Sequence, residues 1–207
     1  IWMHNGYLMV EGEKMSKSLG NFITVNKLIK EYQGEVIRLC MLMTQYRQPL
    51  NWTNDGLSHA KTNMDSFYGA LRATAHIEVA ITPAPPEFVA ALSDDLNTPQ
   101  AISILHELAG SLNKATLDQE LVTAKSGLLA AGKMMGLLQL DPEDWFKWSS
   151  ETSATGMSDA EIDTLINNRQ LARKNKDFLI SDQIRDLLTT EGIILEDGDD
   201  KTIWRRS

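Results

Sequence analysis

Two lysines three positions apart near the start of the chain are the residues whose types and spacing best suit phosphate chemistry. They lie in Lys14-Met15-Ser16-Lys17-Ser18, and Gly12 and Gly20 sit just outside this segment. A segment of this composition can carry two ammonium groups to a polyphosphate and still move. The alternative interpretation is a mobile basic loop with solvated charges, which is common for segments rich in lysine, serine and glycine.

The same five residues match the KMSKS motif of the class I aminoacyl-tRNA synthetases, and the match continues through Leu19-Gly20-Asn21-Phe22. Other stretches resemble the cysteinyl-tRNA synthetases in particular. These stretches are Trp2–Gly6, Tyr46–Asn51, Ser93–Pro99, Ala172–Phe178, Ser181–Asp186, Leu195–Gly198 and Trp204–Arg206. The resemblance covers essentially the whole chain and implies the C-terminal part of such an enzyme, starting just before the KMSKS loop. The hydrophobic start at Ile1 fits a cut inside a larger protein.

The composition is that of an ordinary globular protein with one or two domains. Of the 207 residues, 43% are hydrophobic and 23% are charged, and no apolar run reaches the length of a membrane helix. The single cysteine, Cys40, excludes an intrachain disulfide and favours a reducing, cytoplasmic location. Because the net charge is −8, any binding to nucleic acid must depend on a local basic face. We expect a monomer without membrane contacts.

The hydrophobic periodicity and the resemblance together predict a mainly α fold. We expect the end of a Rossmann-type catalytic domain, with the KMSKS loop and a stem-contacting segment, over 1–52. A helical tRNA-binding bundle would follow over 53–140, then a polar, irregular connector over 141–157. A small α+β anticodon-recognition domain over 158–207 would end in a β-hairpin with a turn at Asp197-Gly198.

Capping residues and turn formers set the expected boundaries of the elements. The expected strands are Tyr7–Val10, Phe22–Ile23, Ile193–Glu196 and Thr202–Trp204. The expected helices are Val25–Tyr32, Glu35–Gln45, Asn54–Ile77, Glu87–Leu92, one opened by Asn97-Thr98-Pro99, Leu121–Met135, Ser158–Lys176 and Phe178–Thr190. Thr24 and Ser158 are the predicted N-caps, Ser158 as part of a capping box with Glu161, and Arg47–Trp52 is a predicted loop.

The resemblance implies that the whole enzyme joins cysteine to its tRNA in two steps. Cysteine and ATP form cysteinyl-adenylate with release of pyrophosphate, and the cysteine is then transferred to the 3′ end of the tRNA. The family assigns the position of Lys17 to ATP, with Lys14 assisting and Ser16 and Ser18 as further hydrogen-bond donors. Ammonium groups placed there stabilise the negative charge that develops on the leaving pyrophosphate.

Two parts of the family's catalytic site have no match in this chain. The HIGH motif, which holds ATP, and the zinc site of cysteine, histidine and glutamate both lie upstream in the family. The four histidines, His4, His59, His76 and His106, do not have the spacing of zinc ligands. We therefore expect zinc in the parent enzyme only, no metal in this chain, and no activation of cysteine by this chain alone.

Basic residues crowd one predicted helix of the C-terminal domain, where Arg173 and Lys176 lie three apart and can share a face. The others are Arg169 and Lys174, with Lys201, Arg205 and Arg206 near the end of the chain. In the family, the positions of Arg173, Phe178, Asp182 and Asp197 surround the anticodon bases, which proteins read by stacking and hydrogen bonding. The family often has tryptophan where this chain has Phe178. The alternative interpretation is an amphipathic helix with solvated charges and Phe178 in the core.

Three other assignments stay open from the sequence. One is a free-standing RNA-binding module without a catalytic partner. Another is the ligase that joins cysteine to an amino sugar in mycothiol synthesis, which lacks a full anticodon-binding end. The last is a more distant class I synthetase, such as the methionine or arginine enzyme. The segments 172–186 and 195–206 argue against the second and third assignments.

Overall fold

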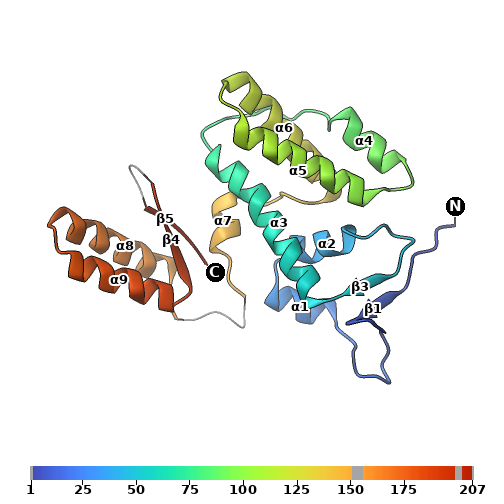
Figure 1. The fold of residues 1–207 in the computed structure, drawn as a ribbon, viewed down its shortest axis with the longest axis horizontal. Coiled ribbons are helices and arrows are strands. Elements are labelled where there is room, and N and C mark those ends of the chain that lie inside the picture. The colour runs from blue at the N-terminus through green and yellow to red at the C-terminus, as the bar shows by residue number, and fades with distance from the viewer. Residues whose placement is uncertain (1, 151–155, 199–201, 207) are drawn as a thin grey trace. The chain divides into compact units, whose positions relative to one another are not determined.

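The computed structural model describes residues 2–150, 156–198 and 202–206, and the chain divides into two compact units, 1–142 and 143–207 (Figure 1). The predicted fold class is confirmed. The described chain is mainly helical, with a short mixed sheet in the first unit and a β-hairpin in the second. None of the described helices is both long enough and apolar enough to cross a membrane.

A three-stranded sheet opens the first unit. Its strands are β1 (Leu8–Val10), β2 (Glu13–Lys14) and β3 (Leu50–Trp52), in the order β2-β1-β3. β1 is antiparallel to β2 and parallel to β3. Parallel strands need a long crossover, and α1 (Val25–Glu31) and α2 (Gly34–Leu42) lie in it. This strand–helix–strand unit is the expected remnant of a Rossmann-type domain.

Two expectations for this region are wrong. Leu50–Trp52 is a strand and not part of a loop, because its backbone pairs with β1 and Trp52 is only 6% exposed. Three residues are too few to show an alternating pattern in the sequence, so the pairing partner decides their conformation. Phe22 and Ile23 lie in no strand. The loop continues to Thr24, which is the N-cap of α1 as predicted. Its side chain accepts a hydrogen bond from Lys27 N.

Four further helices follow in the first unit. They are α3 (Asn54–Ala73), α4 (Pro86–Ser93), α5 (Thr98–Lys114) and α6 (Asp118–Met135). α5 and α6 lie side by side (Figure 1), and the core includes the fully buried Phe67, Leu105 and Leu128. The helix predicted to open at Asn97-Thr98-Pro99 is present, and the Asn97 side chain caps it by accepting from Gln100 N. At the other end of the pair, Gly136, at φ 70°, ends α6.

One carboxylate anchors the segment that follows α6 onto α2 and α3. Glu35 accepts hydrogen bonds from Tyr68 Oη at 3.0 Å, Leu138 N at 2.8 Å and Gln139 N at 2.9 Å. Burial raises the pKa of Tyr68, so its hydroxyl stays protonated and donates to Glu35. Glu35 therefore stabilises a segment about a hundred residues away in the sequence.

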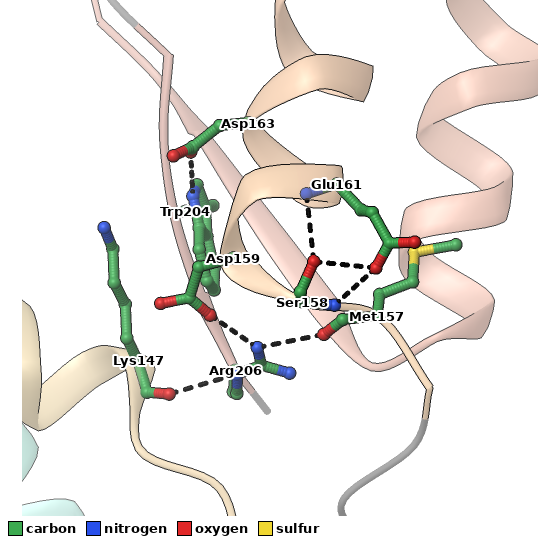
Figure 2. Close-up of polar contacts among 8 residues, drawn as sticks. All are labelled: Lys147, Met157, Ser158, Asp159, Glu161, Asp163, Trp204 and Arg206. Atoms are coloured by element: carbon green, nitrogen blue, oxygen red, sulfur yellow. Dashed lines mark hydrogen bonds and ion pairs between the residues drawn. The ribbon is translucent and has the colours of Figure 1, made fainter.

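The second unit is a helical hairpin packed on a β-hairpin. Its elements are α8 (Asp159–Lys174), α9 (Phe178–Thr190), β4 (Ile193–Asp197) and β5 (Thr202–Arg206). The predicted capping box is confirmed, because Ser158 N donates to the Glu161 carboxylate at 2.8 Å and Ser158 Oγ accepts from Glu161 N (Figure 2). The apolar core is Ile162, Ile166, Leu188, Ile193 and Trp204.

The second unit differs from expectation in its connector and in the start of its hairpin turn. The segment 141–157 is not irregular throughout, because Pro142–Lys147 forms α7, with proline in the first turn and two acidic residues that favour a helix start. The expected hairpin is confirmed, but Asp197 is still in β4, so any turn begins after it. Lys201 lies outside the described residues.

Lys125 is a buried cation on α6 that donates hydrogen bonds to backbone carbonyls just after the C-terminal end of α3. Its Nζ donates to Thr74 O and Ile77 O, both at 2.7 Å, and burial lowers its pKa. These carbonyls lie just past the last turn of α3, where backbone acceptors lack helical partners.

We predict that Lys125→Met lowers the free energy of unfolding by about 1–3 kcal/mol, because one buried and one partly buried carbonyl lose a charged donor. The control Lys133→Met removes an exposed lysine from the same helix and should change stability by less than about 0.5 kcal/mol. Urea unfolding followed by circular dichroism compares the two variants. Equal stability of both variants would show that the Lys125 contacts add nothing.

Candidate functional site

The KMSKS segment forms a folded loop between β2 and α1. The Asn21 side chain closes it, with Nδ2 donating to Lys14 O at 3.3 Å and Oδ1 accepting from Ser16 N at 2.8 Å. Ser16 Oγ accepts from Leu19 N and lies 3.2 Å from Ser18 Oγ. The two serine hydroxyls thus contact each other in this state, and a phosphate would have to displace that contact. The side chains of Lys14 and Lys17 are exposed.

The loop is anchored to the sheet at its first turn. Gly12, at φ 83°, adopts a left-handed conformation that favours glycine, and its N–H donates to Asn51 Oδ1 on β3 at 2.8 Å. At the other end, Gly20 has φ 68° and its N–H donates to Lys17 O at 3.3 Å. The two glycines that flank the motif therefore mark the two bends between which the loop projects.

A second polar cluster joins two of the sequence motifs. Arg47 Nε and Nη2 donate to the two carboxylate oxygens of Asp95 at 2.7 and 3.0 Å, and Tyr46 Oη donates to Asp95 Oδ1 at 2.7 Å. Gln45 Nε2 adds a hydrogen bond to Asp95 O. The hydrogen bonds from Arg47 and Tyr46 lower the pKa of Asp95 to about 2. This cluster fixes the loop before β3 to the turn between α4 and α5.

A third cluster lies at the end of β4 in the second unit. Arg169 donates to both carboxylate oxygens of Asp197 at 2.9 Å, Thr202 Oγ1 donates to Asp197 Oδ1 at 2.7 Å, and Arg173 Nη1 lies 3.3 Å from Asp197 Oδ2. The hydrogen bonds from Arg169, then from Thr202, hold the pKa of Asp197 well below its usual range. The side chain of Arg169 is 6% exposed and that of Asp197 is 42% exposed.

The structure brings some of the predicted anticodon residues together. Arg173 and Asp197 are in direct contact, and Asp182 on α9 contributes to the electrostatic environment of Arg169. Phe178, the first residue of α9, is 64% exposed and so does not lie in the core. No contact joins Phe178 to the other three predicted residues in the described part of the chain. The tight α8–α9 turn nevertheless places it at the same end of the helical hairpin as Arg173 (Figure 1).

Two residues that hold Asp197, Arg169 and Thr202, have roles that the sequence analysis did not assign. Arg169 and Arg173 are four apart on α8 and both contact the carboxylate of Asp197. The expectation that Arg173 and Lys176 share a helix face is wrong, because α8 ends at Lys174. Lys176 instead has a left-handed φ of 59° in the turn. The four-residue spacing of the arginines was the available sequence signal, and Thr202 gave none.

Among the described residues, no three or more His, Cys, Asp or Glu side chains are grouped so that they could hold a metal ion. That zinc belongs to the parent enzyme only stays a prediction.

We predict that Asp197→Asn lowers the stability of the second unit at pH 7 by about 1–3 kcal/mol, because the buried Arg169 loses its counter-charge. The folded-state pKa of Asp197 lies below the unfolded value of about 3.9, so the ion pair contributes fully above that pH. The difference between wild type and variant should shrink as the pH falls below about 4. Urea unfolding followed through the indole N–H signal of Trp204 reports on this unit.

The matched control is Asp186→Asn, which removes an exposed carboxylate from α9. It should change stability by less than about 0.5 kcal/mol at either pH. If Asp197→Asn is no more destabilising than this control, or if its effect grows in acid, the ion pair does not have the role described here.

Two family models match separate parts of the chain. Residues 1–62 match the catalytic domain of the class I tRNA synthetases of type C, and residues 87–139 match the DALR domain. The KMSKS loop therefore lies in the first matched region. The Asp95 cluster joins the two regions, since Arg47 lies in the first and Asp95 in the second.

Curated relatives match the chain along its whole length. The cysteine–tRNA ligases of Paramagnetospirillum magneticum and Rhodospirillum rubrum are 54% and 50% identical to it, each over 100% of this chain and 45% of the relative. That of Maricaulis maris is 46% identical over 99% of this chain and 44% of the relative. The chain thus spans a little under half the length of these relatives. By these matches, the chain belongs to the cysteine–tRNA ligase family of class I aminoacyl-tRNA synthetases.

Proposed function

We propose that the chain works as part of a cysteine–tRNA ligase, to which it supplies the KMSKS loop and much of the tRNA-binding surface. The observation that carries this proposal is the identity of about half its residues to relatives of that name over its full length. The partners of the complete enzyme are then ATP, cysteine and the cysteine tRNA, and its location is the cytoplasm. We infer that this chain alone does not activate cysteine, and we expect it to be a monomer.

The KMSKS loop would act in the first chemical step. The cysteine carboxylate attacks the α-phosphorus of ATP, the bond to the bridging oxygen breaks, and pyrophosphate leaves with the electron pair. Lys17 is exposed at the projecting part of the loop and would stabilise the negative charge that develops on the leaving pyrophosphate. Lys14, near the base of the loop, would add to the positive potential around the phosphates. Closure of the loop on ATP would exchange the Ser16–Ser18 contact for contacts with phosphate oxygens.

We predict that Lys17→Ala in the full-length ligase slows formation of cysteinyl-adenylate by roughly 100-fold or more, with little change in cysteine binding. The reason is that the ammonium group interacts with charge present mainly in the transition state. Pre-steady-state kinetics separates the two effects. Lys27→Ala, an exposed lysine on the nearby α1, is the control and should be close to wild type. An unchanged activation rate in Lys17→Ala would contradict this role.

The end of the helical hairpin in the second unit would read the anticodon. Arg173 is half exposed and already aligned by Asp197, so its guanidinium is preorganised for a base edge. Phe178 offers an exposed ring for stacking, and Asp182 offers an exposed carboxylate that can accept from base N–H groups. Asp197 is engaged by two arginines and Thr202, so we assign it mainly to positioning Arg173, with its exposed part available to RNA.

We predict that Arg173→Ala weakens binding of the native cysteine tRNA transcript on the order of tenfold and removes the preference over a transcript with a changed anticodon. The control Lys174→Ala removes the neighbouring exposed charge, which has no described contact with Asp197. It should weaken binding of both transcripts equally and reduce the salt dependence. Filter binding at two salt concentrations measures both effects. Retention of full anticodon preference in Arg173→Ala would overturn this assignment.

A further inference from the structure

A cavity of about 330 Å³ lies within the second unit, between α7, α8 and β5. Of its lining residues, only Thr202 belongs to a polar cluster described above. Its size is at the lower end of the roughly 300–1,000 Å³ typical of small-ligand sites. Its polar lining residues include Lys147 from α7, Asp163, Asn167 and Gln170 from α8, and Thr202 and Trp204 from β5. Neither the sequence motifs nor the proposed chemistry accounts for this group.

The floor of the cavity is fixed by contacts around Trp204. Trp204 Nε1 donates to Asp163 Oδ1 at 2.8 Å, and the Lys147 ammonium lies 5.0 Å from the centroid of the Trp204 ring (Figure 2). The Arg206 guanidinium lies 5.4 Å from the same centroid and donates to Lys147 O, Met157 O and Asp159 Oδ1. These contacts hold α7 and β5 in place, so the cavity is preorganised rather than formed by a flexible surface.

Two side-chain amides define the chemistry of the cavity. Asn167 and Gln170 are three residues apart and so lie on one face of α8, where both line the cavity. Neither amide forms a side-chain hydrogen bond within the described parts of the chain. Each can offer one donor and one acceptor, the pattern with which Asn and Gln bind two adjacent atoms of a base edge.

The charges of the cavity select against a phosphate. Glu143 and Asp163 contribute two carboxylates, and Lys147 contributes one ammonium group that lies against the indole. A phosphate would meet net repulsion there, whereas a neutral ring with N–H groups would find acceptors on the Asn167 and Gln170 amides. The apolar lining from Ile166 and Ile203 suits the faces of such a ring.

The cavity adjoins the cluster proposed to read the anticodon. Thr202, which lines the cavity, donates to Asp197 at 2.7 Å. On α8, Gln170 in the cavity is three residues from Arg173, which contacts the same Asp197. An RNA strand that presents a base to Arg173 therefore has its neighbouring nucleotides within reach of the cavity.

We propose that this cavity binds one unpaired nucleobase of the tRNA next to the anticodon, through the Asn167 and Gln170 amides. The proposal rests on anticodon reading by the second unit and adds a base-specific contact to it. The base would enter edge-on over Ile203, with its sugar and phosphate left outside in solvent.

The test pairs a protein variant with transcripts that each lack one base. Two transcripts of cysteine tRNA are compared, one with an abasic site on the 5′ side of the anticodon and one with an abasic site on its 3′ side. We expect wild type to bind one of these two transcripts about tenfold more weakly than the native transcript and the other one normally. Asn167→Ala/Gln170→Ala should bind the native transcript about tenfold more weakly and show no further loss with that abasic transcript. Asn168→Ala, an exposed asparagine on the same helix outside the cavity lining, should behave as wild type.

Three results would overturn the proposal. If the double variant binds like wild type while Arg173→Ala loses anticodon preference, the cavity is not a base site but the proposed function stands. If wild type shows no preference for the native anticodon, both proposals fail. If AMP saturates the cavity at micromolar concentration by NMR while both abasic transcripts bind like the native one, the occupant is a free nucleotide and the proposal is wrong.

Discussion

The buried guanidinium of Arg169 is the group on which the candidate recognition surface depends. Its side chain is 6% exposed, and a charge removed from water to that extent needs a hydrogen-bonded counter-ion. Asp197 provides it with two hydrogen bonds of 2.9 Å, which fixes the end of β4 against α8. Thr202 then aligns β5, and Arg173 is held at the exposed edge of the same carboxylate. One ion pair thus positions both Arg173, the arginine proposed to contact RNA, and the wall of the neighbouring cavity.

In the first unit, the Asp95 carboxylate has a corresponding role at the surface. It joins a loop in the matched catalytic domain to a turn in the matched DALR domain. Asp95 and Leu96 both have left-handed φ values, 49° and 52°, which non-glycine residues rarely adopt. The hydrogen bonds from Arg47 and Tyr46 compensate for that conformation. The network explains why two motifs about fifty residues apart both contribute to one local structure.

The sequence alone was sufficient to predict the elements that form through contacts between neighbouring residues. Thr24 and Ser158 cap their helices as predicted, because capping needs only neighbouring backbone N–H groups. β3 was missed because its three residues become a strand only through pairing with β1. For the site, the family motif identified Asp197, but not that the buried Arg169 is its main partner. Such long-range pairs depend on how the hairpin packs on α8, which no local pattern records.

Chemical footprinting of the cysteine tRNA in the presence of the wild-type chain would show whether the second unit reads the anticodon. If the second unit reads the anticodon, the anticodon bases and one flanking base should lose reactivity at their Watson–Crick edges on binding. Protection should disappear when the anticodon is changed but the stem sequences are kept. Protection confined to the backbone of the stems, and equal for both transcripts, would instead mean that binding is phosphate attraction without recognition and would contradict the account.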